Sequence, residues 1–478
     1  MNLNYNDKVS QFVLKDAITQ TLNSFCSSYK DIELYIVGGY LRDLLIDRET
    51  DDRDYVIIGE SANIFAEKLA HYLDGYYVEL DKDNDIARVV LPDKQDYIDI
   101  AACVGNSIEE DLSRRDFTIN AMAFNIDNTS DKGIIDLYNG QSDLANRCLK
   151  VISYKNIIDD PLRILRGFRL ASLLNAEIDN DTYNYIVENR ALLNNVAFER
   201  INTEFNKLFN QNDSFKFVEK MAKSGVLEVV IPELSLQHNV PSNVYHHLGL
   251  YDHTLEVYNQ LEKVIKIVSD TTLSHLQEYI TPSTKRIVAL KYAALLHDIA
   301  KPATWKIDEN NKHSFIGHPE EGSVMAEEIC QKLKLPSNVT KAVVKLVKYH
   351  LYPSQLSNTD EKPTVKAMNR FYRKIDDSVP ELILLAIADR KAAVGPLITE
   401  EILNNNIETL EYILENYYIA REKQEAMPKL VNGKDVMSIL GISPSVRVGE
   451  ILDEIRELQI EEHLITKEDA ILWLKDQL

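Results

Sequence analysis

The stretch that decides the fold is YIVGGYLRDLLIDRETDDRDY, residues 35–55. A short apolar run, Leu34 to Val37, has the composition of a buried strand and leads into the pair Gly38-Gly39. Glycines between a strand and a helix allow backbone N–H groups and the helix N-terminus to approach a phosphate. Tyr40 to Leu45 is predicted to be helical, and Tyr55 to Ile58 is predicted to be a second strand. The stretch therefore predicts an α+β unit with a phosphate-binding turn.

Two aspartates precede that second strand, in Asp52-Arg53-Asp54. Carboxylates separated by one residue point the same way on an extended segment, so they repel unless a cation such as Mg²⁺ lies between them. A third acid, Asp99, stands inside the apolar run Ile98-Asp99-Ile100 and needs a partner or a metal there. Three carboxylates that bridge two metals suit in-line phosphoryl transfer, although the DDRD run taken alone is more simply a solvated turn.

Further outward, strands and helices continue to alternate over roughly the first 140 residues, whereas helical periodicity dominates from about residue 143 onward. Residues 1–30 and 62–73 are predicted to be helical. The segments YYVEL, ARVVL and YIDIA are predicted to be strands. The 478 residues allow about three domains. The prediction is an α+β head with a mixed sheet and helices, followed by an all-α region.

Composition restricts the class of protein. The N-terminus lacks a secretory signal, no run approaches the ~18 apolar residues of a membrane helix, and the four cysteines form no CxxC pair, which together predict a cytoplasmic protein without membrane contact. The net charge of −22 argues against binding nucleic acid. A middle stretch is locally basic, however, and so leaves an RNA-binding surface possible; its cations are Arg163, Arg166, Arg169, Arg190, Arg200 and Lys207.

Four motifs now carry a resemblance: GGYLRD (38–43), DRD (52–54), RRDFTINAMAFN (114–125) and DDPLRILRGFRLAS (159–172). In this order and spacing they resemble the class II tRNA nucleotidyltransferases and bacterial poly(A) polymerases, a branch of the polymerase-β-like nucleotidyltransferases. The resemblance extends over the whole chain. It implies four parts: a nucleotidyltransferase head at 1–142, a helical neck for base selection and RNA binding at 143–235, an HD domain at 236–400, and a helical tail at 401–478.

The resemblance also implies roles for individual residues. Asp52 and Asp54 match the family's Mg²⁺ carboxylates, and Asp99 matches its third strand acid. Asp160 and Arg163 match the pair that reads the base edge, although Asp159 stands where Glu is usual, and ERINTE (199–204) matches a mainly structural motif. The remaining nucleotide-binding residues are Gly38, Gly39, Arg42 and Asp43 for the triphosphate, Arg114, Arg115, Asp116 and Asn120 for ribose and triphosphate, and Arg166 and Arg169 beside the base readers.

A second set of residues lies in the helical region. The adjacent pair His297-Asp298 is accompanied by His253 before it and Asp389 after it, in the ligand order of the HD phosphohydrolases. His318 and His350 are predicted to contact the phosphate or a second metal, and Lys301 could pair with a phosphate. Imidazole and carboxylate ligands suit a divalent transition metal or Mg²⁺. The segment resembles the HD domain of enterobacterial-type tRNA nucleotidyltransferases, which implies hydrolysis of 2′,3′-cyclic or 2′-phosphates.

The resemblance implies an enzyme that adds CCA to the 3′ end of tRNA from CTP and ATP, as a monomer or homodimer. Only a short segment separates Asp99 from Arg114, whereas relatives that add the complete CCA carry a longer flexible loop there. A CC-adding enzyme that relies on an A-adding partner is therefore an alternative. A poly(A) polymerase is another, although that group has a basic C-terminal extension and this chain ends acidic. From a different class, the chain could be an HD nucleotide hydrolase with an inactive binding head.

Overall fold

The computed structural model of the protein describes residues 5–29, 31–50, 52–127, 133–242, 247–310, 313–357, 362–395, 398–460 and 463–477. Two compact units account for them. The N-terminal unit comprises Met1–His350 and Ala388–Ile398, and the C-terminal unit comprises Leu351–Ile387 and Thr399–Leu478. The predicted head and neck lie entirely within the N-terminal unit. The division of the chain into four parts stays a prediction.

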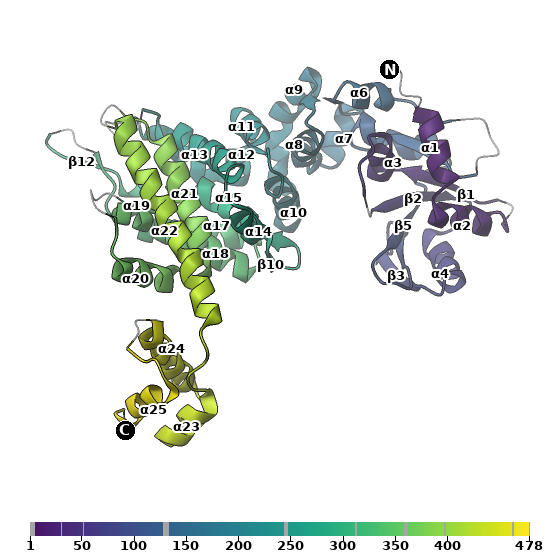
Figure 1. Cartoon of the computed structure of the whole chain (residues 1–478). Helices are drawn as coiled ribbons and strands as arrows, with labels where there is room; N and C mark the ends of the chain where they lie inside the picture. Colours follow the sequence, from purple (N-terminus) through teal and green to yellow (C-terminus); the bar gives the residue numbers. More distant parts are fainter. Residues whose placement is uncertain are drawn as a thin grey trace. The chain divides into compact units, whose positions relative to one another are not determined.

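A mixed seven-stranded sheet forms the head (Figure 1). In sheet order its strands are β3 (Tyr76–Asp81), β4 (Ile86–Val90), β5 (Tyr97–Ala102), β2 (Arg53–Ile58), β1 (Glu33–Val37), β6 (Met122–Asn125) and β7 (Ile135–Asp136). The β2–β5 pair is parallel, and the other neighbouring pairs are antiparallel. The predicted strands are confirmed. Most apolar residues of β1, β2, β4 and β5 are buried or half-buried in the sheet, whereas Tyr76, Val78 and Leu80 of the edge strand β3 are exposed.

Helices cover both faces of this sheet. On one face, Tyr35, Val37 and Val56 pack against Ile108 and Leu112 of a short helix after β5. On the other, α3 lies along β1, β2 and β6, while α4 lies along β3, β4 and β5. The helices of the head are α1 (Tyr5–Val13), α2 (Ala17–Cys26), α3 (Gly38–Leu45), α4 (Ala62–Tyr72), α5 (Ile108–Ser113) and α6 (Gly140–Ala145), with the 3₁₀ turn η1 (Thr118–Asn120).

The single helix predicted over residues 1–30 is instead two helices, α1 and α2. The break occurs at Asp16, whose carboxylate accepts a hydrogen bond from the backbone N–H of Thr19 at 2.8 Å and so caps the N-terminus of α2. An aspartate at this position stabilises a helix start because it satisfies an otherwise unpaired N–H group. Residues 1–4 and Lys30 lie outside the described residues.

The neck and the HD region of the N-terminal unit are helical. The neck elements are α7 (Tyr154–Asp159), α8 (Arg163–Leu174), α9 (Asn180–Asn189), η2 (Arg190–Asn195), α10 (Phe198–Phe209), α11 (Phe215–Lys223), α12 (Val226–Val230) and η3 (Pro232–Asn239). The HD helices are α13 (Leu250–Ile265), α14 (Asp270–Gln277), α15 (Arg286–Leu296), α16 (Lys301–Thr304), α17 (His318–Lys332), α18 (Ser337–Tyr349) and the end of α21 (Val379–Ala392).

Three short strand pairs interrupt this helical region. They are β8–β9 (Cys148–Leu149 with Glu177–Ile178), β10–β11 (Tyr279–Thr281 with Thr284–Lys285) and β12–β13 (Lys306–Ile307 with His313–Ser314). The pair β10–β11 lies between α14 and α15, and β12–β13 lies between α16 and α17, whereas α7 and α8 separate the two parallel strands of β8–β9. The predicted fold class, an α+β head followed by helical parts, is confirmed.

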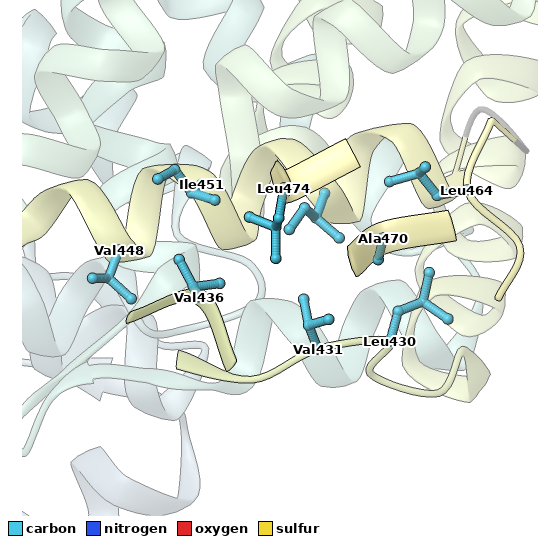
Figure 2. Close-up of a cluster of buried hydrophobic side chains, with 9 residues drawn as sticks. Leu430, Val431, Val436, Val448, Ile451, Leu464, Ala470 and Leu474 are labelled. Carbon is cyan, nitrogen blue, oxygen red and sulfur yellow. The ribbon is translucent and has the colours of Figure 1, made fainter. Parts of the chain in front are cut away.

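The C-terminal unit ends in a small helical core of its own (Figure 2). Leu430, Val431, Val436, Ile451 and Leu474 are buried together there. The helices of this unit are α19 (Leu351–Ser357), α20 (Val365–Ile375), the 3₁₀ turn η4 (Asp376–Ser378), α21 as far as Ile387, α22 (Glu400–Ala426), α23 (Gly433–Leu440), α24 (Val446–Ile460) and α25 (Lys467–Lys475). Among all described residues, no helix is both long enough and apolar enough to cross a membrane.

Candidate active sites

The strand register brings the three acids of the head together. Asp54 on β2 lies directly opposite Asp99 on the parallel strand β5, and Asp52 precedes β2 by one residue. Burial, together with the negative charges of Asp99 and Asp52, raises the pKa of Asp54 to about 6. Arg53, between the two aspartates, points to the opposite face, where it donates to Asp16 at 3.0 Å and to Tyr40 at 2.9 Å. Mutual repulsion of this kind favours a bound cation at Asp54.

Two residues that sequence reasoning missed contact these acids. Arg88 on β4 donates to both carboxylate oxygens of Asp99, at 2.6 and 2.7 Å. Its guanidinium also lies over the ring of Tyr97, 3.8 Å from the centroid, and the Tyr97 hydroxyl donates to Asp52. The hydrogen bond to Asp52 and burial raise the pKa of Tyr97 to about 12, so this hydroxyl keeps its proton. The alternation of residues along YIDIA and ARVVL could have indicated their shared face.

The glycine turn lies beside the acids. Gly38 adopts a positive φ of 62°, and a Cβ on it would lie only 3.0 Å from the guanidinium of Arg115. Glycine is therefore required both for the backbone conformation and for the approach of this arginine. Arg42 is buried and bonded to the Asp43 carboxylate at 2.8 Å. Backbone N–H groups and guanidinium groups thus converge where a triphosphate could bind.

A buried polar network continues from Arg42. Its guanidinium donates to Asn120 Oδ1 at 2.8 Å, and Asn120 Nδ2 donates to Asp116 at 3.0 Å. Arg166 donates to the other oxygen of Asp116 at 2.6 and 2.9 Å. Burial alone would raise the pKa of Asp116, but Arg166 and Asn120 hold it well below its usual range. Asn120 is thereby fixed in one orientation.

Arg114 and Arg115 share one buried carboxylate. Asp111 on α5 is fully buried and accepts from Arg114 at 2.8 Å and from Arg115 at 2.8 Å. Burial opposes the charge of Asp111, yet the two arginines lower its pKa. This acid was not predicted. It stands three and four residues before the arginines on a helical turn, a spacing that could have indicated the contact.

The proposed base readers bond to different partners. Arg163 donates to the backbone carbonyls of Arg114 at 2.7 Å, Asn156 at 3.0 Å and Arg115 at 3.3 Å. Asp160 pairs with the half-exposed Arg200 at 3.0 Å. Arg163 therefore supports the backbone of the arginine motif, and Asp160 lies nearer the solvent. Arg169 is paired with the buried acid Glu204.

The second site is assembled from separate helices of the N-terminal unit. His253 lies in α13, and His297 and Asp298 follow the end of α15. His318 begins α17, and His350 follows α18. All five of these side chains are buried. The sixth predicted ligand, Asp389 on α21, has its Oδ1 3.0 Å from His253 Nε2 and 3.9 Å from His297 Nε2.

Asp298 lies at the centre of this cluster. Its Oδ2 is 3.2 Å from His297 Nε2 and 3.8 Å from His253 Nε2. Its Oδ1 is 3.4 Å from His318 Nε2 and 3.6 Å from His350 Nε2. Each oxygen therefore faces its own pair of imidazoles, and both groups have ligand spacing suited to a metal ion. This arrangement can hold one cation, or two that share the Asp298 carboxylate.

Backbone carbonyls fix three of the imidazoles. Nδ1 of His297, His318 and His350 lies 2.9, 2.7 and 2.7 Å from the carbonyl oxygens of the residues three positions earlier. Because a carbonyl only accepts, Nδ1 carries the proton and Nε2 presents a lone pair to the site. His318 and His350 bring their Nε2 atoms to 3.2 Å of each other. Two facing lone pairs require a cation or a shared proton, which favours a metal site.

The pKa values of His350, Asp298 and His297 are shifted by burial and by their charged neighbours. Burial, with the nearby His297 and His318, lowers the pKa of His350 to about 3, so it is neutral at physiological pH. Burial opposes ionisation of Asp298, but His297 and Lys301 hold its pKa well below the usual range. Lys301, predicted to meet a phosphate, lies 2.6 Å from Asp298 Oδ2. His350 and Asp298 therefore have the protonation states that metal ligation needs. Burial opposes protonation of His297, but Asp298 and Asp389 raise its pKa, so a metal that binds there would displace a proton.

Comparisons with known proteins agree with this arrangement. Family models match residues 34–150 (poly A polymerase head domain), 175–237 (probable RNA and SrmB-binding site of polymerase A) and 250–394 (HD domain). An A-adding tRNA nucleotidyltransferase of Deinococcus radiodurans is 30% identical over 91% of this chain and 93% of its own length. A CC-adding tRNA nucleotidyltransferase of Thermus thermophilus is 29% identical over 93% of this chain and 94% of its own.

A solved structure shares the fold. The Thermotoga maritima CCA-adding enzyme complexed with tRNA has a TM-score of 0.63 at 21% identity, and the match covers 98% of both chains. The resemblance drawn from the four sequence motifs is therefore confirmed. The chain belongs to the family of tRNA nucleotidyltransferases and poly(A) polymerases with an HD domain, and it is a nucleotidyltransferase.

Proposed function

We propose that this chain transfers nucleotides from CTP, from ATP or from both to the 3′ end of tRNA in the cytoplasm, without a nucleic-acid template. The observation that carries the proposal is the in-register pair of Asp54 and Asp99, with Asp52 beside them and the Gly38 turn next to the acids. The relatives named A-adding and CC-adding support tRNA as the acceptor. A separate prediction is that the enzyme is a monomer or a homodimer.

Different residues of the head would bind the metal ions, the triphosphate and the base. Asp52 and Asp54 would hold divalent cations, and their repulsion fits a Mg²⁺ site. When bound, such cations neutralise the triphosphate and the leaving pyrophosphate, as in two-metal transfer. The Gly38 turn, Arg42 and Arg115 would orient the triphosphate. Asp160 and Arg163 remain the proposed readers of the base edge.

The connection between β5 and α5 bears on which nucleotides are added. It spans only residues 103–107 and is tied down locally. Asn106 N–H donates to the Glu110 carboxylate at 2.8 Å, and Val104 N–H donates to Asp111 at 3.3 Å. A site that accepts first C and then A needs a part that changes between the two states. This short, bonded connection lacks room for a flexible loop, which favours CC addition over the complete CCA reaction.

Labelled-nucleotide incorporation into three tRNA transcripts tests the proposal. The transcripts end at the discriminator base, at C, or at CC, and each is offered CTP alone, ATP alone or both. CC addition predicts extension of the first two with CTP and no product from the third. Extension of the third with ATP would establish CCA addition if CTP is also used, and A addition if it is not. Failure to extend any transcript, or long A tracts, would reject the proposal.

A second activity is favoured by the cluster of six predicted ligands that has Asp298 at its centre. We propose that this site binds one or two divalent metals and hydrolyses phosphoesters of the 2′,3′-cyclic or 2′-phosphate class. The carbonyl-fixed imidazoles support ligation, because their Nε2 atoms face the site. A transition metal suits this nitrogen-rich set better than Mg²⁺ alone.

Metal content and hydrolysis test this second activity together. The purified chain should take up divalent metal and hydrolyse a 2′,3′-cyclic nucleotide, and a chelator should remove both properties. Mg²⁺, Mn²⁺, Co²⁺ and Ni²⁺ would be tried separately. A chain that takes up no metal at this site and cleaves no phosphoester with any of the four would mean that the HD domain is a structural remnant.

A further inference from the structure

One face of the head sheet gathers more than the three acids. Residues opposite each other on neighbouring strands share a face, as do residues two apart on one strand. Asp99 lies opposite Asp54 on β2 and opposite Arg88 on β4. Tyr97 is two residues before Asp99, and Asp52 is two residues before Asp54. Arg88 and Tyr97 therefore lie on the face that carries the proposed metal carboxylates.

These residues form a continuous chain of contacts. Both oxygens of Asp99 accept from Arg88, at 2.6 and 2.7 Å, in a two-point ion pair. The Arg88 guanidinium lies flat against Tyr97, 3.8 Å from its ring centroid. The Tyr97 hydroxyl donates to Oδ1 of Asp52. Asp52 is itself exposed, so this bond restricts a side chain that would otherwise sample several rotamers.

The geometry assigns Arg88 and Tyr97 as positioning residues of the nucleotidyl-transfer site: Asp99 anchors Arg88, Arg88 holds the Tyr97 ring, and Tyr97 orients the Asp52 carboxylate toward the cation. On this view Asp99 acts through Arg88, which donates to both of its oxygens. The inference rests on the proposed function of the head. It adds residues that hold a metal carboxylate in place, a role whose loss costs about 10- to 100-fold in metal affinity or activity.

Three variants and a control test the inference in the full chain. Tyr97→Phe removes the hydroxyl but keeps the ring, and Arg88→Lys keeps the charge but loses the two-point contact. The third variant combines both changes. Tyr76→Phe is the matched control, because Tyr76 is exposed on the edge strand β3 and is separated from Tyr97 by Val90 of β4. Mn²⁺ binding is measured by electron paramagnetic resonance. The Mn²⁺ binding that is lost in the double variant Asp52→Asn/Asp54→Asn is assigned to the head. The kcat and the KM for CTP are measured with tRNA as the acceptor.

Each single variant is expected to weaken Mn²⁺ binding at the head about 10- to 100-fold and to lower kcat, with KM for CTP changed less than about threefold. In Mn²⁺ affinity and kcat, the double variant should be no more than about threefold below the more impaired single variant, because both changes act on the same Asp52 oxygen. Tyr76→Phe should match the wild type, and all variants should unfold at the wild-type temperature.

Two results would overturn the inference. One is wild-type Mn²⁺ affinity and kcat in Tyr97→Phe. The other is a double variant whose fold-loss in Mn²⁺ affinity and kcat equals the product of the losses in the two single variants, which would mean that Arg88 acts independently of Tyr97. Failure of the proposed function gives a different result, because the wild-type chain would then not extend tRNA. If only the assignment of the metal carboxylates were wrong, Asp52→Asn/Asp54→Asn would keep the full Mn²⁺ stoichiometry and still extend tRNA.

Discussion

At the scale of single residues, the arginines of the head are held by acids that are themselves buried. Asp111 holds Arg114 and Arg115, and Asp116 holds Arg166. A chain of net charge −22 can therefore hold these guanidinium groups in fixed positions beside the proposed triphosphate site. Fixed charges need no reorganisation when a phosphate arrives, which strengthens their effect on a reaction that redistributes charge.

Asp54 gives a prediction about pH. Its folded pKa of about 6 lies above the ordinary 3.8, so its ionised form opposes folding above about pH 6. Asp54→Asn should raise the free energy of unfolding in chelator by about 1–2 kcal/mol at pH 7.5, because a shift of one pKa unit corresponds to about 1.4 kcal/mol and partial exposure reduces the effect. This gain should shrink as the pH falls from 6 towards 3.8, because Asp54 is then protonated in the folded chain and becomes neutral in the unfolded chain as well only below about pH 3.8.

Urea unfolding at three pH values measures this difference. The control is Asp83→Asn in the exposed turn between β3 and β4, for which a change within about 0.5 kcal/mol is expected. A destabilised Asp54→Asn at pH 7.5 would contradict the repulsion among the three acids.

Asp160 gives a prediction about base choice. Asp160→Ala should reduce discrimination among CTP, ATP, UTP and GTP by about 1–3 kcal/mol, because a wrong base would no longer leave a buried group unpaired. Arg200→Ala removes the partner of Asp160 and is the control. It should leave the incorporation ratios within about twofold. Equal changes in both variants would mean that Asp160 only anchors Arg200.

At the scale of elements, one buried ion pair joins the neck to the HD helices. Lys291 on α15 is fully buried and lies 2.6 Å from Glu262 on α13. Lys291 also donates to the Ser214 hydroxyl at 3.0 Å, and Glu262 accepts from the backbone N–H groups of Ser214 and Phe215, each at 2.9 Å. The pair therefore fixes two helices and the start of α11 to one point.

Removal of one partner should be costly. Lys291→Met should lower the free energy of unfolding by about 3–5 kcal/mol, because Glu262 would stay buried without its counter-ion. Lys263→Met, which removes an exposed lysine 4.0 Å from Glu256, should change it by less than about 0.5 kcal/mol. Chemical denaturation measures both. A small effect of Lys291→Met would indicate that backbone N–H groups alone satisfy Glu262.

At the scale of the whole molecule, the two proposed sites draw on different elements. The head acids come from β2 and β5, whereas the HD ligands come from helices α13 to α21 and the residues that follow them. Their described ligands share no residue. The C-terminal unit adds a separate core around Val436 and Ile451 (Figure 2).

This separation predicts independent activities. His297→Ala/Asp298→Ala should abolish hydrolysis of a 2′,3′-cyclic nucleotide and leave tRNA extension within about twofold of the wild type. Asp52→Ala/Asp54→Ala should do the reverse, because loss of metal carboxylates removes several kcal/mol of transition-state stabilisation. If His297→Ala/Asp298→Ala prevents folding, the single variant His297→Gln is used in its place. Loss of both activities in a folded variant would show that the sites are coupled.

The sequence by itself determined what is local or periodic in this protein. The DRD run and the glycine turn each lie in a short segment, and the HD ligands follow one another in a recognisable order along the chain. The apolar alternation of the strands reflects which side chains are buried. From these, the fold class, the family and the candidate ligands could be predicted. The split of residues 1–30 into two helices was missed, because the cap at Asp16 outweighs the helical periodicity around it.

Only the tertiary structure decided which side chains meet. Arg88 is joined to Asp99 by the β4–β5 register, and Lys291 is joined to Glu262 by helix packing. Arg163 supports backbone carbonyls forty-eight and forty-nine residues earlier. Such pairings depend on register and on packing between elements, which spacing along the chain does not encode. Buried charges make them necessary, since an unpaired charge in the interior would cost more than the fold can offset.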